Sequence, residues 1–334
     1  MKRTLVKHYN LLDLARVYCA CLVVFIHMGL PKSVSLVPCL ARQAVPFFFL
    51  VSGFFFAKQA DRKEDPLRFA LKYAGSILIV YAAWTLLWLP YFIREYLISY
   101  GDRSPLYVLL VILRRILLAG AAQYWYLLVL AEGVLLLGLI RRFRAWRVGW
   151  ILCVLGLALH ILYDLEPSGG IAARINKLFY TVFSWNCNVV MTGFPLLFLG
   201  AAFARNEHRL QSLRRAPVGI LYLVFVLLAF AVYGISYSHY GIPFWLIEAL
   251  LLFLFCILPS GLDARIPASL CRPARNLSSV IYLTHTAFLS LFGYVFQIWR
   301  TELRFLLCVL TACLLTWLVK KINWAPLNKL MMVK

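Results

Sequence analysis

Acidic residues are scarce in this chain of 334 residues, which has 13 aspartates and glutamates against 34 lysines and arginines. Charged residues of both signs make up 14% of the sequence, whereas hydrophobic residues make up 63%. So little charge excludes an ordinary soluble globular protein, in which about a quarter of the residues are charged. Several apolar runs approach the roughly 20 residues of a membrane-spanning helix. The composition therefore predicts an all-α, polytopic membrane protein.

Motifs typical of soluble enzymes and pumps are also absent. The 9 cysteines form no Cys-x-x-Cys pair and no metal-ligand spacing, so we expect no metal site. No glycine-rich phosphate loop is present, which argues against an ATP-driven pump. The basic residues recur between apolar runs instead of clustering with aromatic residues, so nucleic acid is not an expected partner. We therefore expect the function to lie within the membrane bundle.

The apolar segments predict the path of the chain through the membrane. They lie near residues 11–30, 42–57, 70–93, 105–121, 123–140, 148–165, 185–204, 218–236, 242–259, 278–299 and 303–319. Segment 105–121 has Arg114 and Arg115 in its middle, and we interpret it as an interfacial or re-entrant helix. About ten spans remain, and most basic residues then lie on the side of the two termini. The positive-inside rule predicts that both termini are cytoplasmic.

The first segment contains three ionisable residues, Asp13, Arg16 and His27. Charged groups within a membrane are costly and are usually functional. At about 100° per residue, all three share one helix face, and Arg16 and His27 are about 16 Å apart along it. The two charges interrupt the apolar run, so we expect this segment to be retained and not cleaved as a signal peptide. The spacing suits a site that binds an anion near one surface and performs chemistry deeper in the membrane.

The second segment begins with an arginine and a proline. Arg42 could simply extend its charge to the headgroups, but we expect a kink at Pro46 and close helix packing at Ser52 and Gly53. Gln123–Leu127 lies at the mouth of another span, where Trp and Tyr are commonly interfacial anchors. A late span contains Tyr282–His285.

Together, these residues resemble acyltransferase family 3, whose pattern covers most of the chain. The first helix of that family reads approximately D-x-x-R-x10-H, which Asp13, Arg16 and His27 match. The second helix is matched by Arg42, Val45, Pro46, Phe48, Phe49, Ser52 and Gly53. Two further aromatic elements are matched by Trp125, Tyr126 and Leu127 and by Tyr282, Leu283 and His285. The Val-Pro-Phe-Phe-Phe run is also similar to the membrane domain of membrane-bound serine racemases.

The resemblance implies an enzyme that transfers an acyl group, usually acetyl, from cytoplasmic acyl-CoA to an extracytoplasmic acceptor. Acceptors in the family are mostly hydroxyl groups of cell-envelope glycans, such as surface polysaccharide, or of glycolipids. No permanently bound cofactor is expected, because acyl-CoA is a donor substrate. We expect residues 1–334 to form a single membrane domain without a soluble catalytic domain, in the bacterial plasma membrane.

Thioester chemistry suggests a role for each candidate residue. An imidazole titrates near pH 6.5, which suits His27 as the base that deprotonates the acceptor hydroxyl. Arg16 suits the phosphates of CoA, and Asp13, one turn away, would orient it. Arg42 would act on the oxyanion or on an anionic acceptor, and His285 would share the proton with His27. We assign acyl-CoA binding to Arg16 together with Ser52, Trp125 and Tyr282.

Other interpretations stay open at this point. A transporter or flippase for an amino acid or a lipid-linked saccharide could use Asp13, Arg16 and His27 as a polar pathway, although no convincing inverted repeat is visible. The chain could also be a catalytically silent partner of another membrane enzyme. His285 could have only a structural role, and the intramembrane carboxyl groups of Glu132 and Glu248 have no assigned role. The sequence does not identify the acceptor or the acyl chain.

Overall fold

The computed structural model describes residues 9–28, 40–100, 102–165, 169–183, 185–210, 212–235, 244–259, 263, 265–298 and 300–333. Within these ranges the secondary structure is helical, with no β-strand. The chain divides into two compact units, and each is described separately. The first unit comprises Met1–Phe48, Asn206–Ser238 and Pro243–Lys334, and the second comprises Phe49–Arg205 and His239–Ile242.

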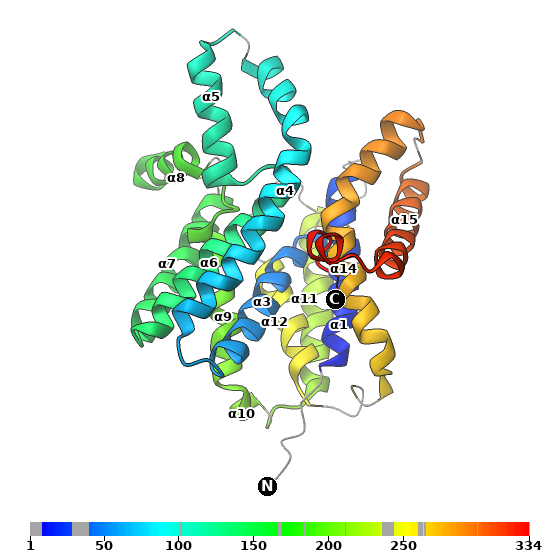
Figure 1. The fold of residues 1–334 in the computed structure, drawn as a ribbon. Coiled ribbons are helices and arrows are strands. Elements are labelled where there is room, and N and C mark those ends of the chain that lie inside the picture. Colours follow the sequence, from blue (N-terminus) through cyan, green and yellow to red (C-terminus); the bar gives the residue numbers. More distant parts are fainter. Residues whose placement is uncertain are drawn as a thin grey trace. The chain divides into compact units, whose positions relative to one another are not determined.

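The first unit is built around the N-terminal helix α1 (Asn10–His27) and the long helix α14 (Ala268–Ser290), which pack along each other (Figure 1). A π-helical turn, η4 (Leu291–Val295), extends α14. Helix α1 also contacts α12 and α15, and α11 packs against α12. The remaining helices of this unit are α10 (Glu207–Leu210), α11 (Arg215–Ile235), α12 (Phe244–Ile257), α15 (Thr301–Ile322) and α16 (Ala325–Leu330).

In the second unit, α6 packs against α4, α9 and α7, and α7 also packs against α9 (Figure 1). Helix α3 (Ala44–Ala60) begins in the first unit and continues into the second. The other elements are α4 (Pro66–Tyr100), α5 (Pro105–Arg114), η1 (Arg115–Ala119), η2 (Ala122–Tyr124), α6 (Trp125–Arg142), α7 (Trp146–Asp164), α8 (Gly170–Phe183), η3 (Val189–Gly193) and α9 (Phe194–Arg205).

Polar side chains fix the starts of several of these helices. The Asp65 carboxylate accepts hydrogen bonds from the backbone N–H groups of Leu67 and Arg68 at the start of α4. These bonds, that of Arg68 most of all, lower the pKa of Asp65. The Asn188 side chain accepts two backbone hydrogen bonds at the start of η3, at 2.9 Å each. Capping residues of this type satisfy backbone donors that a helix leaves open.

Helices α3 and α9 approach each other through glycine. A Cβ atom on Gly53 would lie 2.0 Å from the carbonyl oxygen of Leu197, and one on Gly200 would lie 2.1 Å from that of Leu50. The close packing predicted at Gly53 is therefore confirmed. Pro46 lies in the first turn of α3, directly after a turn at residues 42–43 that interrupts the helical path, so its missing N–H group breaks no hydrogen bond of α3.

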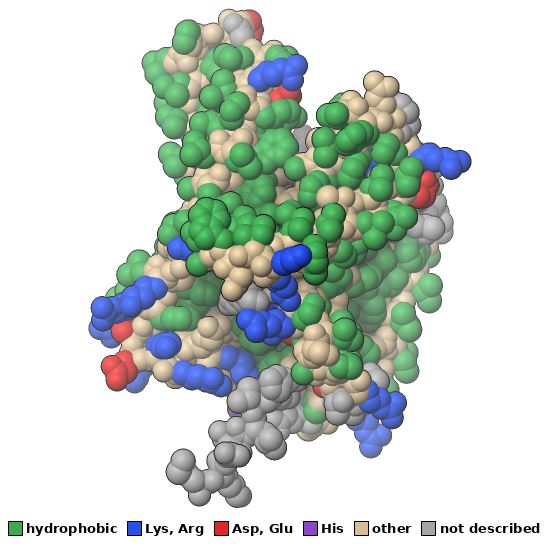
Figure 2. All heavy atoms as spheres, turned by 45° about the vertical axis from the view of Figure 1, so that its right-hand side comes forward, with side chains coloured by type: hydrophobic (Ala, Val, Ile, Leu, Met, Phe, Trp, Pro, Cys, Tyr) green, Lys and Arg blue, Asp and Glu red, His purple; other side chains and the backbone are tan. Residues whose placement is uncertain are grey.

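Hydrophobic side chains cover much of the visible surface (Figure 2). Leu86 and Leu87 of α4, for example, are 69% and 68% exposed. Among the described residues, six helices are long and apolar enough to cross a membrane, and three shorter apolar helices accompany them. The six long helices are Asn10–His27, Pro66–Tyr100, Trp146–Asp164, Arg215–Val232, Ala268–Val295 and Thr301–Ile322. The chain is therefore a multi-pass membrane protein, while the number of about ten spans and the side of the termini stay predictions.

Each apolar segment predicted from the sequence coincides with a helix, but three features differ from expectation. Helix α4 has 35 residues and continues past Pro90, beyond the predicted end at residue 93. The segment predicted as interfacial consists of α5 and the π-helix η1, which ends at Gly120 with φ of 78°. Helix α8 lies between two of the predicted segments, where no helix was expected, and none of its residues is buried.

Candidate active site

The charged end of the α1 face contains a three-residue cluster in the first unit. Nη1 of Arg16 lies 3.2 Å from Oδ1 of Asp13, so the predicted pairing of these two residues is confirmed. The Arg275 guanidinium of α14 adds a contact of 3.4 Å to Oδ2 of the same carboxylate. Asp13 is only 8% exposed. One buried carboxylate thus holds two guanidinium groups, one on each of two neighbouring helices.

Two histidines meet at the other end of this face. The ring centroids of His27 and His285 are 5.0 Å apart, so the structure brings together two residues far apart in sequence. His285 is fully buried, and its Nδ1 atom donates to the backbone carbonyls of Tyr282 at 2.8 Å and Ile281 at 3.1 Å. Carbonyl oxygens only accept hydrogen bonds, so we assign the neutral tautomer with the proton on Nδ1.

The second ring nitrogen of His285 has a different environment. Nε2 is buried and has no hydrogen-bond partner among the residues that the structure describes. In the assigned tautomer this atom carries a lone pair, so it can accept a proton or an N–H group. A buried acceptor without a partner is costly and typically indicates a functional position.

The contacts at both ends show that α1 and α14 run parallel. Asp13 contacts Arg275 near the start of each helix, and His27 lies beside His285 further along both. The ten-span path predicted from the sequence also requires these two helices to cross the membrane in the same direction. The helix pair therefore carries guanidinium groups at one end and imidazole groups at the other.

Arg304 of α15 lies near the histidine end and was missed by the sequence analysis. Its Nη2 atom is 3.5 Å from the carbonyl oxygen of Met28, the residue that follows His27. Phe25 and Phe305 stack beside it, with ring centroids 4.4 Å apart. The Nε atom of Arg304 is buried and lacks a hydrogen-bond partner within the described part of the chain. In the sequence, the only sign of this residue is its position, a positive charge at the start of the predicted segment 303–319.

Arg42 and Tyr282 also belong to the first unit. Arg42 lies in the turn immediately before α3 and is partly buried. The Tyr282 ring lies on α14, 6.4 Å from the ring of His285. Tyr282 therefore contributes to the histidine end in two ways, through its ring and through the backbone carbonyl that fixes the tautomer of His285.

Ser52 and Trp125 belong to the second unit, so their environment is described there alone. The Ser52 hydroxyl lies 3.1 Å from that of Tyr126. The Phe49 ring lies 4.5 Å from the Tyr126 ring and 6.2 Å from the Trp125 ring. The predicted motif residues of α3 and α6 thus pack together in one aromatic layer.

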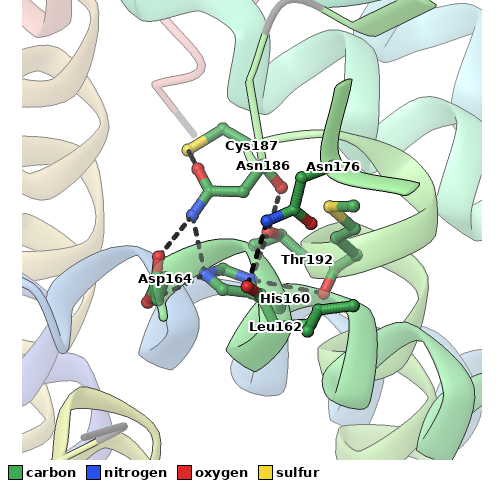
Figure 3. Close-up of polar contacts among 8 residues, drawn as sticks. His160, Leu162, Asp164, Asn176, Asn186, Cys187 and Thr192 are labelled. Carbon is green, nitrogen blue, oxygen red and sulfur yellow. Dashed lines mark hydrogen bonds and ion pairs between the residues drawn. The ribbon is translucent and has the colours of Figure 1, made fainter. Parts of the chain in front are cut away.

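The second unit also contains a polar network around His160 of α7, a residue to which the sequence analysis gave no role (Figure 3). Asn186 Nδ2 lies 3.0 Å from Nε2 of His160 and donates to Asp164 at 2.9 Å. Thr192 Oγ1 lies 3.1 Å from Nδ1 of His160. The Asp164 side chain is only 7% exposed, so its carboxylate belongs to this buried network.

The two intramembrane carboxyl groups differ in burial. Glu248 of α12 is fully buried, and neither of its carboxyl oxygens has a hydrogen-bond partner among the described residues. Glu132 of α6 is only partly buried. No three His, Cys, Asp or Glu side chains in the described ranges could together hold a metal ion.

Comparison with known proteins gives one match. A model of a protein family described as an acyltransferase domain, family 3, matches residues 9–321, which is nearly the whole chain. No curated protein and no solved structure matches the chain.

Proposed function

The chain belongs to this family of membrane acyltransferases, and we propose that it moves an acyl group from cytoplasmic acyl-CoA to an extracytoplasmic hydroxyl group. The simplest donor is acetyl-CoA, which would make the protein an O-acetyltransferase. The proposed acceptor is a glycan or another component of the cell envelope, and the proposed location is the plasma membrane of a bacterium.

One observation carries this proposal. The α1–α14 pair has guanidinium groups at one end and two imidazole groups at the other. Arg16 and His27 are separated by about 16 Å along α1. The pantetheine arm of CoA has a comparable length. The phosphates at one end of this arm could therefore bind near Arg16 while the thioester at the other end lies at His27.

The proposed reaction balances with His27 as the only proton carrier. His27 takes the proton of the acceptor hydroxyl while the hydroxyl oxygen attacks the carbonyl carbon of the thioester. The resulting oxyanion collapses, the C–S bond breaks, and the imidazolium gives its proton to the departing thiolate. The products are an ester and free CoA.

His285 would act by positioning His27. Its Nε2 lone pair is the available acceptor for an N–H group of His27, whose ring centroid is 5.0 Å away. Such a bond would hold the other ring nitrogen of His27 free to act as the base. The same arrangement, in which a fixed acceptor orients a catalytic imidazole, recurs in unrelated hydrolases.

The oxyanion needs a hydrogen-bond donor, and two arginines are candidates. Arg42 precedes α3, and Arg304 contacts the backbone next to His27. We propose that at least one of them stabilises the oxyanion or an anionic acceptor. Ser52 and Trp125 stay assigned to acyl-CoA binding through their motifs alone.

The proposal can be tested with full-length protein in lipid nanodiscs. We expect the wild type to release CoA from acetyl-CoA when a glycan extract is supplied, as measured by mass spectrometry. His27→Ala removes the base and should lower the rate by at least about 100-fold. His208→Ala, a matched change at an exposed histidine of α10, should leave the rate unchanged.

Two results would contradict the proposal. Equal rates for the wild type and His27→Ala would exclude His27 as the base. If no donor and acceptor pair gave any turnover, transport would become the better hypothesis. Glu248 would then be the first residue to test, because buried intramembrane carboxyl groups are typical of proton-coupled transport.

A further inference from the structure

A hollow of about 350 Å³ in the second unit is lined by arginine side chains. It lies where α6 and α9 end and where the connection from α3 reaches α4. Its lining residues are Asp61, Pro66, Arg141, Arg144, Trp146 and Arg205. The lining of this hollow thus contains three guanidinium groups and a single carboxylate. We call this hollow the arginine pocket.

Arg141 is the buried member of the arginine pocket. Its side chain is only 9% exposed and forms an ion pair with Asp61. Its Nε atom is buried and has no hydrogen-bond partner in the described part of the chain. The single carboxylate of the pocket is therefore engaged by Arg141, and one buried N–H group of that guanidinium stays available.

The other two arginines have no carboxylate partner among the described residues. The Arg205 guanidinium lies 4.6 Å from the ring centroid of Trp146, and that of Arg141 lies 5.9 Å from the same centroid. The indole ring thus holds cationic side chains from two helices near each other. Like charges in such proximity repel, so the arrangement is favourable mainly when an anion joins it.

A structural role explains these arginines only in part. Arg141 and Arg205 lie in the last turns of α6 and α9, where cations interact favourably with the helix dipole. That effect accounts for each residue separately, but not for their convergence on one hollow. It also does not account for Arg144, which lies in the turn after α6.

Arg144 has an unfavourable backbone conformation. Its φ of 53° is in the left-handed region, in which glycine or asparagine usually ends a helix. A residue that carries a Cβ atom is disfavoured in this region. Strain of this kind clusters at functional sites. The Arg144 side chain lines the pocket from this turn.

We propose that the arginine pocket binds a phosphate-bearing ligand, with Arg144 and Arg205 as charged donors and Trp146 as a stacking surface. Guanidinium groups match phosphate oxygens with two hydrogen bonds each. A second hollow, of about 720 Å³, lies at the start of α4 and is lined by four basic side chains, Arg62, Lys63, Arg68 and Lys72, against the two carboxylates of Glu64 and Asp65. This basic surrounding attracts anions to the region.

Two sources could supply the same phosphate chemistry, a soluble nucleotide and the headgroup of an anionic phospholipid. The proposal does not depend on acyl transfer, since binding is measured without any thioester. One arm of the test uses radiolabelled adenosine 3′-phosphate 5′-diphosphate with full-length protein in phosphatidylcholine nanodiscs. The other arm counts phosphatidylglycerol molecules that native mass spectrometry finds retained on the protein.

Arg205→Gln and Arg144→Gly should each weaken the binding of one of these probes by about tenfold or more, because each removes a charged donor. Arg144→Gly should also leave the melting temperature unchanged or raise it, since glycine suits the left-handed backbone. Arg147→Gln removes a nearby charge that does not line the pocket, and we expect less than about a twofold change.

The outcomes separate clearly. Loss of nucleotide binding identifies a nucleotide as the ligand, and loss of retained lipid identifies the headgroup. The proposal is overturned if neither probe binds, or if Arg147→Gln weakens binding as much as the two pocket variants do. Acyl transfer could fail for other reasons without changing any of these results.

Discussion

Two histidines are buried in the described part of the protein, and their environments are opposite. His160 in the second unit has a hydrogen-bond partner at each ring nitrogen, Asn186 at Nε2 and Thr192 at Nδ1. His285 in the first unit has partners at Nδ1 only, and its Nε2 atom has none among the described residues. Both are 6% exposed or less. Burial alone therefore does not distinguish them.

The difference lies in what each ring can still do. A histidine with both nitrogens engaged contributes to stability, because its polar atoms are satisfied inside an apolar environment. A histidine with one free lone pair costs stability and keeps an acceptor available for chemistry. The comparison favours a structural role for His160 and agrees with the role proposed for His285, and three substitutions test this difference.

The largest effect is expected at His285. His285→Ala removes the acceptor that would orient His27, so kcat should fall by about 10- to 100-fold. The KM for acetyl-CoA should change little, since the donor phosphates would bind at the other end of α1. Steady-state kinetics of full-length protein in nanodiscs would measure both parameters. An unchanged kcat would reduce His285 to a packing residue.

A smaller effect, on stability alone, is expected at His160. His160→Ala leaves Asn186 and Thr192 without their buried partner, which should lower the unfolding free energy by about 1–3 kcal/mol. Thermal unfolding followed by fluorescence would measure the change, and kcat per folded molecule should stay the same. Thr192→Val, which keeps the shape of the side chain, should destabilise the protein less. A specific loss of kcat in either variant would contradict the structural role of His160.

The smallest effect is expected at Arg304. This substitution tests whether the active site around His27 and His285 also includes a side chain of α15. Arg304→Gln keeps the length of a polar side chain but removes its charge, and we expect a decrease in kcat/KM of about three- to tenfold. Arg300→Gln, at the residue before α15, provides a matched control with no expected change. Equal rates for both variants would leave Arg42 as the only candidate for the oxyanion.

The sequence predicted the helices well, because apolar runs of this length have few alternatives in a membrane. Helix α8 was missed because only one of its faces is apolar, and Arg174 and Lys177 on the other face resemble a loop. The length of α4 was missed because the charged residues Arg94 and Glu95 end the apolar run, although the helix continues to Tyr100.

The candidate site was only partly predictable from the sequence. The Asp13–Arg16 pair follows from local spacing along one helix, and the structure contains it. Arg275 and Arg304 reach the same helix from distant segments, and no local pattern indicates such contacts. The network of His160 depends on the turn around Asn186 that precedes η3, and this turn forms only when the chain folds.

The glycine contacts between α3 and α9 have a mechanical consequence. Gly53 and Gly200 each lie against a carbonyl group of the opposite helix. A slide by one residue would replace them with neighbours such as Phe54 and Leu199, which do not fit that spacing. The two helices therefore cannot slide past each other without steric clashes. During a catalytic cycle, we expect them to move together as one rigid piece and to leave rearrangement to other helices.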